Sequence, residues 1–119
     1  MADHIHLFTP GAAVTCVASS DVIGGRLVEI TGPRAVGPAA LTSAKVFGAA
    51  AQDTKAGEDV LVLRGGVQKL VSSAAIVAGS RVKSAAAGKV VTVGAGENGN
   101  GLALTTVTAA DQPIQIALD

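Results

Sequence analysis

Aromatic residues are almost missing from this sequence, which has two Phe and neither Trp nor Tyr among its 119 residues. Carbohydrate sites usually stack sugar rings on exposed Trp or Tyr, so this lack argues against a sugar-binding module. Large rings also contribute little to the interior, which must be built from Val, Leu, Ile and Ala. The sequence therefore predicts an aliphatic core whose stability association would increase.

Charge is the second scarce property. Charged residues make up 15% of the chain, and nine Lys and Arg balance nine Asp and Glu. The basic residues are scattered and form no stripe of the kind that binds a nucleic-acid backbone. A surface with so little charge is more typical of a protein that associates with other proteins than of a soluble monomer. We expect protein partners and no nucleic acid.

Cysteine and long apolar runs are scarce as well. Cys16 is the only cysteine, which excludes an intramolecular disulfide, and its apolar neighbours predict a small buried side chain. No run approaches the ~20 apolar residues that cross a bilayer, and residues 1–4 lack the basic and apolar regions of a signal peptide. We expect a protein that is made in the cytoplasm and has no membrane partner.

Short aliphatic runs separated by glycine are what the chain does contain: 49% of its residues are hydrophobic and 15 are Gly. Brief strands with turn residues between them predict an all-β fold, a small compact β-barrel or sandwich. Residues 1–10 predict an extended N-terminal arm, and residues 11–119 a single β-rich domain. The expected strands are 13–17, 26–31, 45–50, 59–64, 67–71, 80–83, 89–93, 102–108 and 114–119.

The clearest local signal is Gly65-Gly66, which lies between two aliphatic runs and predicts a tight hairpin. The continuous apolar run of residues 59–64 predicts a central strand that is buried on both faces. Residues 35–44, rich in Ala and Pro, predict an irregular connection. The alternation of residues 114–119 predicts a last strand that closes the sheet. No internal repeat with a fixed period is evident.

Two motifs carry a chemical interpretation beside a structural one. Residues 94–99 (GAGENG) have the spacing of a dinucleotide fingerprint, but Asn100-Gly101 follows where that motif needs a helix, so a loop is expected. His4 and His6 would lie on one side of an extended segment and share a metal. Two ligands are too few, and we expect neither a metal nor a cofactor.

The sequence shows no group of residues with the types and spacing that a catalytic site requires. Both histidines lie in the arm, where a base is held least rigidly. The carboxylates of Asp53, Glu58 and Asp59 fall in a polar turn that predicts solvated charge. These features predict no catalytic residues, no small-molecule substrate and no enzyme.

Seven short motifs, taken in order, point to a family. They are 9–11 (TPG), 23–28 (IGGRLV), 45–51 (KVFGAAA), 55–60 (KAGEDV), 63–67 (LRGGV), 78–82 (AGSRV) and 87–90 (AGKV). Together they make the chain resemble the capsid cement, or capsid decoration, proteins of tailed bacteriophages. The resemblance runs from about residue 8 to the C-terminus.

This resemblance implies a structural protein that adds to the outer surface of the phage head in the virion. It implies a homotrimer that bridges neighbouring subunits of the major capsid protein, with no cofactor and no catalytic residues. Within that frame the arm is expected to supply part of the anchor. The residues expected to bind the partner are His4, Ile5, His6, Leu7, Phe8 and Pro10.

Some alternatives remain open at this point. Phe8 is one of two aromatic residues and is either an anchor at the interface or a plug of its own barrel. The competing functions are a free-standing β-barrel that binds a ligand or carbohydrate, and a structural subunit of a phage tail or another protein shell.

Overall fold

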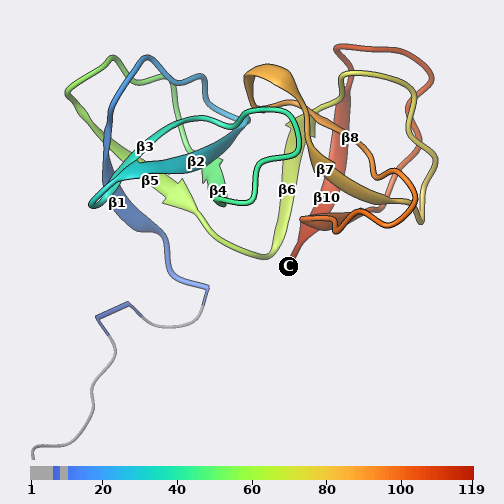
Figure 1. The fold of residues 1–119 in the computed structure, drawn as a ribbon, viewed down its shortest axis with the longest axis horizontal. Coiled ribbons are helices and arrows are strands. Elements are labelled where there is room, and N and C mark those ends of the chain that lie inside the picture. The colour runs from blue at the N-terminus through green and yellow to red at the C-terminus, as the bar shows by residue number, and fades with distance from the viewer. Residues whose placement is uncertain (1–6, 9–10) are drawn as a thin grey trace, which may run out of the picture.

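Short strands make up nearly all the regular structure of the computed structural model, which describes residues 7–8 and 11–119 (Figure 1). The one helical element in this part of the chain is a single 3₁₀ turn, η1 (Ala86–Gly88). The predicted all-β class is confirmed. Each strand spans three to six residues because glycine and turn residues interrupt the aliphatic runs.

The N-terminal half of the fold, residues 14–63, is a closed barrel with the strand order β1-β3-β2-β4-β5. Its interior is formed by alternate side chains, so that in β1 every second residue is buried. Cys16 is one of them, as its apolar neighbours predicted, with 2% of its surface exposed. The strands are β1 (Val14–Ala18), β2 (Leu27–Gly32), β3 (Ala35–Pro38), β4 (Val46–Ala50) and β5 (Asp59–Leu63).

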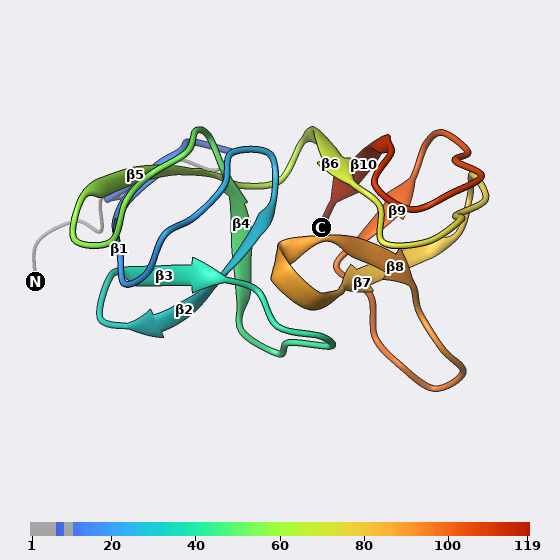
Figure 2. The same cartoon turned by 90° about the horizontal axis from the view of Figure 1, so that it is seen from above.

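The C-terminal half, residues 67–118, contains a five-stranded sheet with the order β6-β10-β9-β7-β8. A parallel bridge between Ser72 and Val90 connects the two ends of this order. Seen from above, the two halves lie side by side (Figure 2). The strands are β6 (Val67–Val71), β7 (Arg81–Ser84), β8 (Val90–Thr92), β9 (Gly101–Ala103) and β10 (Pro113–Leu118).

The two halves repeat one topology. In each half the first strand pairs antiparallel with the fifth, the fifth with the fourth, the fourth with the second and the second with the third. In each, the first strand or its end also meets the third in a parallel contact. The expectation that the chain contains no repeat is therefore wrong at the level of the backbone.

Backbone hydrogen bonds outside the strands match as well. Val22 and Thr54 exchange two bonds of 2.9 and 3.0 Å, and Ile76 and Val107 exchange two of 3.0 and 2.9 Å. The other matched pairs, with the amide donor first, are Gly57–Ala18 with Asp111–Ser72, Ser19–Val36 with Ser73–Val90, Gly25–Ala50 with Gly79–Ala103, and Ala51–Leu61 with Leu104–Gln115. In two of these matches, Ser19–Val36 with Ser73–Val90 and Gly25–Ala50 with Gly79–Ala103, the residues are identical, and in the others they differ. The identities are too few and too scattered for the sequence to show the repeat.

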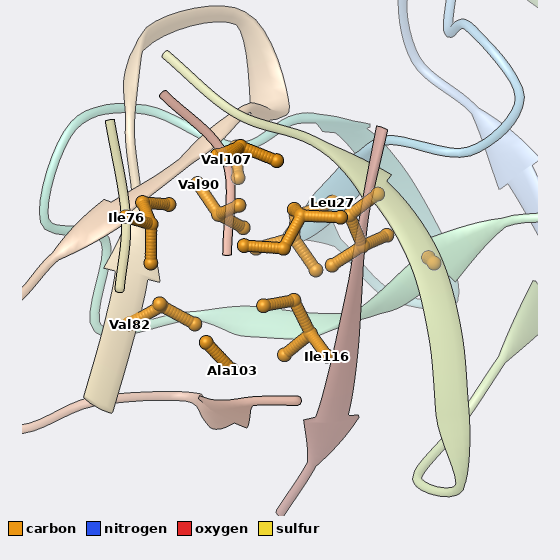
Figure 3. Packing of buried hydrophobic residues seen from close by; sticks show 11 residues of the cluster. Leu27, Ile76, Val82, Val90, Ala103, Val107 and Ile116 are labelled. Atoms are coloured by element: carbon orange, nitrogen blue, oxygen red, sulfur yellow. The ribbon is translucent and has the colours of Figure 1, made fainter. Parts of the chain in front are cut away.

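One hydrophobic cluster joins the two halves. The N-terminal barrel has its own core, but Leu27, Ala39 and Ala49 belong to the cluster of the C-terminal half. Figure 3 shows Leu27 among Ile76, Val82, Val90, Val107 and Ile116. Burial of a Leu side chain contributes roughly 1.5–3 kcal/mol, so the halves stabilise each other.

Polar contacts also cross the junction. The buried Ser84 hydroxyl donates to the Ala40 carbonyl at 2.8 Å and accepts from the Ser43 N–H at 3.0 Å. The Gly88 N–H donates to the Ala39 carbonyl at 2.9 Å. Gly88 has φ +75°, and a Cβ there would lie 2.4 Å from the Leu27 carbonyl oxygen. Only glycine fits this close approach.

The predicted hairpin at Gly65-Gly66 is wrong. Both glycines do have positive φ, but β5 pairs with β1 and β4, whereas β6 pairs with β10 and belongs to the other sheet. The glycines therefore form the link between the halves. Two aliphatic runs and a two-residue link do not reveal that each strand has better partners elsewhere in the chain.

Three further expectations need correction. Residues 35–38 form β3, which pairs with β1 and β2, where an irregular connection was expected. β5 is buried on one face only, because Leu61 is 41% exposed. β10 lies between β6 and β9 in its sheet, and it does not close it. The expected loop at residues 94–99 is confirmed, since no strand or helix includes it.

Candidate interaction surfaces

Phe8 lies on the outside of the N-terminal barrel. The residue is 41% exposed, and the guanidinium carbon of Arg34 lies 5.2 Å from the ring centroid. Arg34 donates from Nη2 and Nε to the Thr15 carbonyl at 2.6 and 3.2 Å, which fixes the guanidinium over the ends of β1 and β3. The ring is therefore held by a cation–π contact at the surface and is not part of the barrel core.

Of the other expected arm residues, only Leu7 is among the residues that the structure describes. Leu7 is 92% exposed, so within the part of the chain that the structure describes its side chain is not packed. His4, Ile5, His6 and Pro10 lie outside the described residues. The assignment of these six residues to partner binding stays a prediction.

The second phenylalanine pairs with an arginine too. The guanidinium carbon of Arg64 lies 4.4 Å from the Phe47 ring centroid, and Arg64 Nε donates to the Phe47 carbonyl at 2.9 Å. Phe47 is partly buried against the barrel core, in contrast to Phe8. Phe8 is thus the aromatic side chain that a partner is able to cover.

Aliphatic side chains are exposed on both halves. Ile23 and Val77, at matching positions of the repeat, are 49% and 65% exposed. Others lie on strands: Val17 and Leu61 in the N-terminal half, and Val67 and Leu102 in the C-terminal half. Leu104 follows directly after β9. Exposed aliphatic side chains in groups mark protein–protein contacts. The sequence did not predict these residues, because the residue type alone does not show whether a Leu on a strand faces the core or the solvent.

Carboxylates gather around a cavity of about 440 Å³ at the loop end of the N-terminal barrel. Asp53 Oδ1 accepts the Gly24 N–H and Asp21 Oδ1 accepts the Ala56 N–H, both at 2.9 Å. Glu58 and Asp59 lie on the same rim. Two of the four rim carboxylates thus accept backbone N–H groups of the loops.

All three ion pairs between described residues lie in the C-terminal half. Lys83 Nζ lies 2.8 Å from both carboxylate oxygens of Glu97 and, together with the Gly94 N–H, lowers the pKa of Glu97. Arg81 lowers the pKa of Asp119 by a paired hydrogen bond, and Lys89 lowers that of Asp111. These pairs are solvent-exposed, so each contributes little to stability.

Groups with chemical reactivity are used structurally in the described part of the chain. The buried Ser72 hydroxyl donates to the Ala109 carbonyl at 3.0 Å, and Cys16 lies in the barrel core. Within residues 7–8 and 11–119, no three His, Cys, Asp or Glu side chains converge on a point where a metal would bind. No helix among the same residues has the length and apolar character to span a bilayer.

A closed barrel and a five-stranded sheet of the same topology share one core and carry exposed aliphatic side chains on their surfaces. The sequence matches the family model described as phage cement protein over residues 8–118. Among solved structures, the chain is similar to the head fiber gp8.5 N base of bacteriophage phi29, with a TM-score of 0.70 and 18% identity. That match covers 91% of this chain and 93% of the other. No curated protein matches.

The chain belongs to the phage cement protein family, because the family model covers nearly its whole length. It is therefore a structural protein of the phage capsid and is associated with the virion. The resemblance drawn from the seven short motifs is confirmed. The likeness to the phi29 head fiber base, at 18% identity, shows that the two chains share a fold.

Proposed function

We propose that this protein binds the outer surface of the phage head as a homotrimer and bridges neighbouring subunits of the major capsid protein. The family places the protein on the phage capsid, and the observation that supports the bridging role is the repeated topology. A closed barrel and a five-stranded sheet with the same strand pairing, joined by a common core, form one body with two similar ends. A stiff body that contacts two capsid subunits must detach from one before they separate.

Many weak contacts acting together would hold the protein on the phage head. A contact of micromolar affinity corresponds to about 8 kcal/mol. A trimer that engages several subunits at once gains further through effective concentration, without any stronger single contact. The near absence of net charge fits a protein partner, and it gives no attraction for the packaged genome.

The arm is proposed as part of the anchor. Phe8 is half-exposed and held in place by Arg34, so a partner can cover the ring without first ordering it. Pre-positioned aromatic side chains are frequent energetic centres of interfaces. The remaining arm residues, His4, Ile5, His6, Leu7 and Pro10, would extend the contact to a neighbouring subunit.

Purified heads that lack the protein provide the test. The full-length chain is added to them, unbound protein is removed by sedimentation, and occupied particles are imaged. Density on the outer surface that spans two capsid subunits is expected. Density confined to a single subunit, or on the tail, would contradict the bridging role.

Deletion of residues 2–8 and the single change Phe8→Ala test the arm. Both should reduce occupancy strongly while the unfolding transition stays unchanged, because Phe8 lies outside the barrel core. Leu41→Ala is the matched control, since Leu41 is an exposed aliphatic residue in the loop between β3 and β4. Full occupancy after deletion of the arm would reject its anchoring role.

A further inference from the structure

Two Asn-Gly dipeptides follow each other in the chain, Asn98-Gly99 and Asn100-Gly101. Such dipeptides are prone to deamidation, because glycine has no side chain to hinder attack of its backbone nitrogen on the Asn side chain. The structure places the two in different surroundings. The first lies in the loop between β8 and β9, which projects from the C-terminal half (Figure 2), and the second leads into β9.

Asn98 is exposed to solvent, and nothing in the loop holds its side chain. The neighbouring Glu97 is bonded to Lys83 and to the Gly94 N–H. The Asn98 amide, in contrast, makes no hydrogen bond to any residue that the structure describes, and the same holds for the Gly99 N–H. The reacting carbon and the attacking nitrogen are therefore both accessible in the folded protein.

Asn100 is held on several sides. Its N–H donates to the Val82 carbonyl at 2.6 Å, and its Oδ1 accepts the Ser84 N–H at 3.3 Å. Gly101 is buried in β9, opposite Val82 of β7 and Leu118 of β10. The Asn100 side chain must leave Ser84 and the strand must open before the same reaction can take place there.

Both glycines are required by the packing of the chain. A Cβ at Gly99 would lie 2.8 Å from the Val82 carbonyl oxygen, and a Cβ at Gly101 would lie 2.7 Å from the Ala117 carbonyl oxygen. A larger residue, which would slow the attack, does not fit at either position unless the backbone shifts. The fold therefore keeps a reactive dipeptide in an exposed loop.

We propose that Asn98 is a site of spontaneous deamidation in the folded protein and that Asn100 is protected. The Gly99 nitrogen gives up its proton and forms a bond to the side-chain carbonyl carbon of Asn98. The bond from that carbon to the side-chain nitrogen breaks, and the nitrogen leaves as ammonia with the proton. Water then opens the cyclic imide at either carbonyl carbon and leaves aspartate or isoaspartate at position 98. Nothing is oxidised or reduced.

Either product carries a carboxylate that the asparagine lacks. Because nine acidic residues balance nine basic ones in the chain, modified molecules acquire a net negative charge. The new charge is next in the chain to the Glu97 carboxylate, which Lys83 Nζ bonds at 2.8 Å. Isoaspartate also lengthens the loop backbone by one carbon. Ion-exchange chromatography therefore separates modified from unmodified protein.

Timed incubation of the folded, full-length protein at mildly alkaline pH tests the proposal. No Lys or Arg follows Lys89, so trypsin releases residues 90–119 as one peptide, in which tandem mass spectrometry distinguishes the two positions. Position 98 should convert at least about tenfold faster than position 100, since Asn100 reacts only after local opening. Equal rates at the two positions, or faster conversion of position 100, would overturn the proposal.

The same incubation in urea shows whether the structure causes the difference. Both dipeptides should then convert at similar rates, because unfolding removes the contacts of Asn100 with Val82 and Ser84. A difference of the same size in the unfolded chain would assign the selectivity to the neighbouring sequence and would overturn the protection by the fold.

Matched substitutions assign the acidic species. Asn98→Gln should abolish it, because a Gln side chain must close a larger and less favourable ring. Asn100→Gln is the control and should leave the species in place. Thermal unfolding of both variants checks that each is folded. An acidic species that forms in the Asn98→Gln variant at the original rate would contradict the assignment to Asn98.

Discussion

The N-terminal and C-terminal halves have one backbone pattern and very different side chains at their loop ends. Asp21, Asp53, Glu58 and Asp59 surround the cavity of the first half. The matching positions of the second half are Ala75, Thr106, Gln112 and Pro113, none of them charged. The same loops thus form with and without carboxylates.

One hydrogen bond makes the comparison direct. The Gly24 N–H donates to Asp53 Oδ1 at 2.9 Å, and the matching Ala78 N–H donates to Thr106 Oγ1 at 3.0 Å. A hydroxyl and a carboxylate perform the same task. The fold requires an acceptor at this position and does not require its charge, so the acidic rim is a property of the surface and not of the scaffold.

The halves also differ in what their matching strand faces contact. Leu27 of the first half is fully buried in the shared cluster, whereas its counterpart Arg81 is exposed and paired with Asp119. The difference shows that burial at this strand face depends on whether the other half packs on it, with Leu at the covered position and Arg at the uncovered one.

The largest expected effect comes from the shared cluster. Leu27→Ala should lower the free energy of unfolding by about 2–5 kcal/mol, because it leaves a cavity between the halves. Urea denaturation provides the measurement. Leu102→Ala, on the matching exposed face, should change stability by no more than about 0.5 kcal/mol. Equal losses for the two variants would mean that the halves do not stabilise each other.

The matched glycines Gly48 and Gly101 should show the next largest effect. A Cβ would lie 2.4 Å from the Leu63 carbonyl oxygen at Gly48, and 2.7 Å from that of Ala117 at Gly101. Each Gly→Ala change should cost about 1–3 kcal/mol, since the backbone must shift. Gly32→Ala is the control, with the nearest atom at 3.7 Å. Tolerance at one site and not at the other would show that the halves pack differently there.

Exchange of side chains between the halves should have a small effect. Asp53→Thr should leave the unfolding free energy within about 0.5 kcal/mol of the original, because the hydroxyl still accepts the Gly24 N–H. Asp53→Ala should cost about 1 kcal/mol, because that amide loses its acceptor. Chemical denaturation of both variants gives the comparison. If Thr is as costly as Ala, the first half needs the carboxylate itself.

Lowering the pH should have the smallest effect on stability, and this effect should arise mostly in the C-terminal half. Glu97, Asp111 and Asp119 have lowered pKa values there, because Lys83, Lys89 and Arg81 bond their carboxylates. In the other half, the pKa of Glu29 is lowered by the Ala40 N–H. Such groups stabilise the fold above their ordinary values of 4.5 for Glu and 3.8 for Asp, and this contribution is lost as pH falls through the lower folded pKa.

Carboxyl titrations by NMR and urea denaturation across acidic pH check this prediction. The amides of the C-terminal half should lose protection at a higher pH than those of the N-terminal barrel. The Glu97→Gln variant should flatten part of the pH dependence. An unchanged slope in that variant would contradict the role of the Lys83–Glu97 pair.

Much of the local structure follows from the residues nearby. The expected strands coincide with nine of the ten observed ones, because aliphatic runs bounded by glycine favour extended backbone wherever they occur. β3 was missed because Ala35–Pro38 is short and contains Gly and Pro. The expected strand at 102–108 ends at Ala103, since Val107 is held in an isolated bridge to Ile76.

The candidate surfaces were harder to foresee. The contact of Phe8 with Arg34 depends on the hairpin of β2 and β3, and β3 was not predicted from the sequence. The exposure of Val67 and Leu102 depends on which side of β6 and β9 points outward, and a change of one residue in register reverses that. Neither surface has a motif of its own.

The sequence by itself determined the class of fold, the aliphatic core, the lack of net charge and the family. These properties depend on composition and on the order of short segments, which local physical chemistry governs. The tertiary structure alone decided that one strand topology is built twice, that Leu27 joins the two halves and that aliphatic side chains such as Val67 and Leu102 are left exposed. These depend on strand pairing between residues far apart in the chain, which no local pattern specifies.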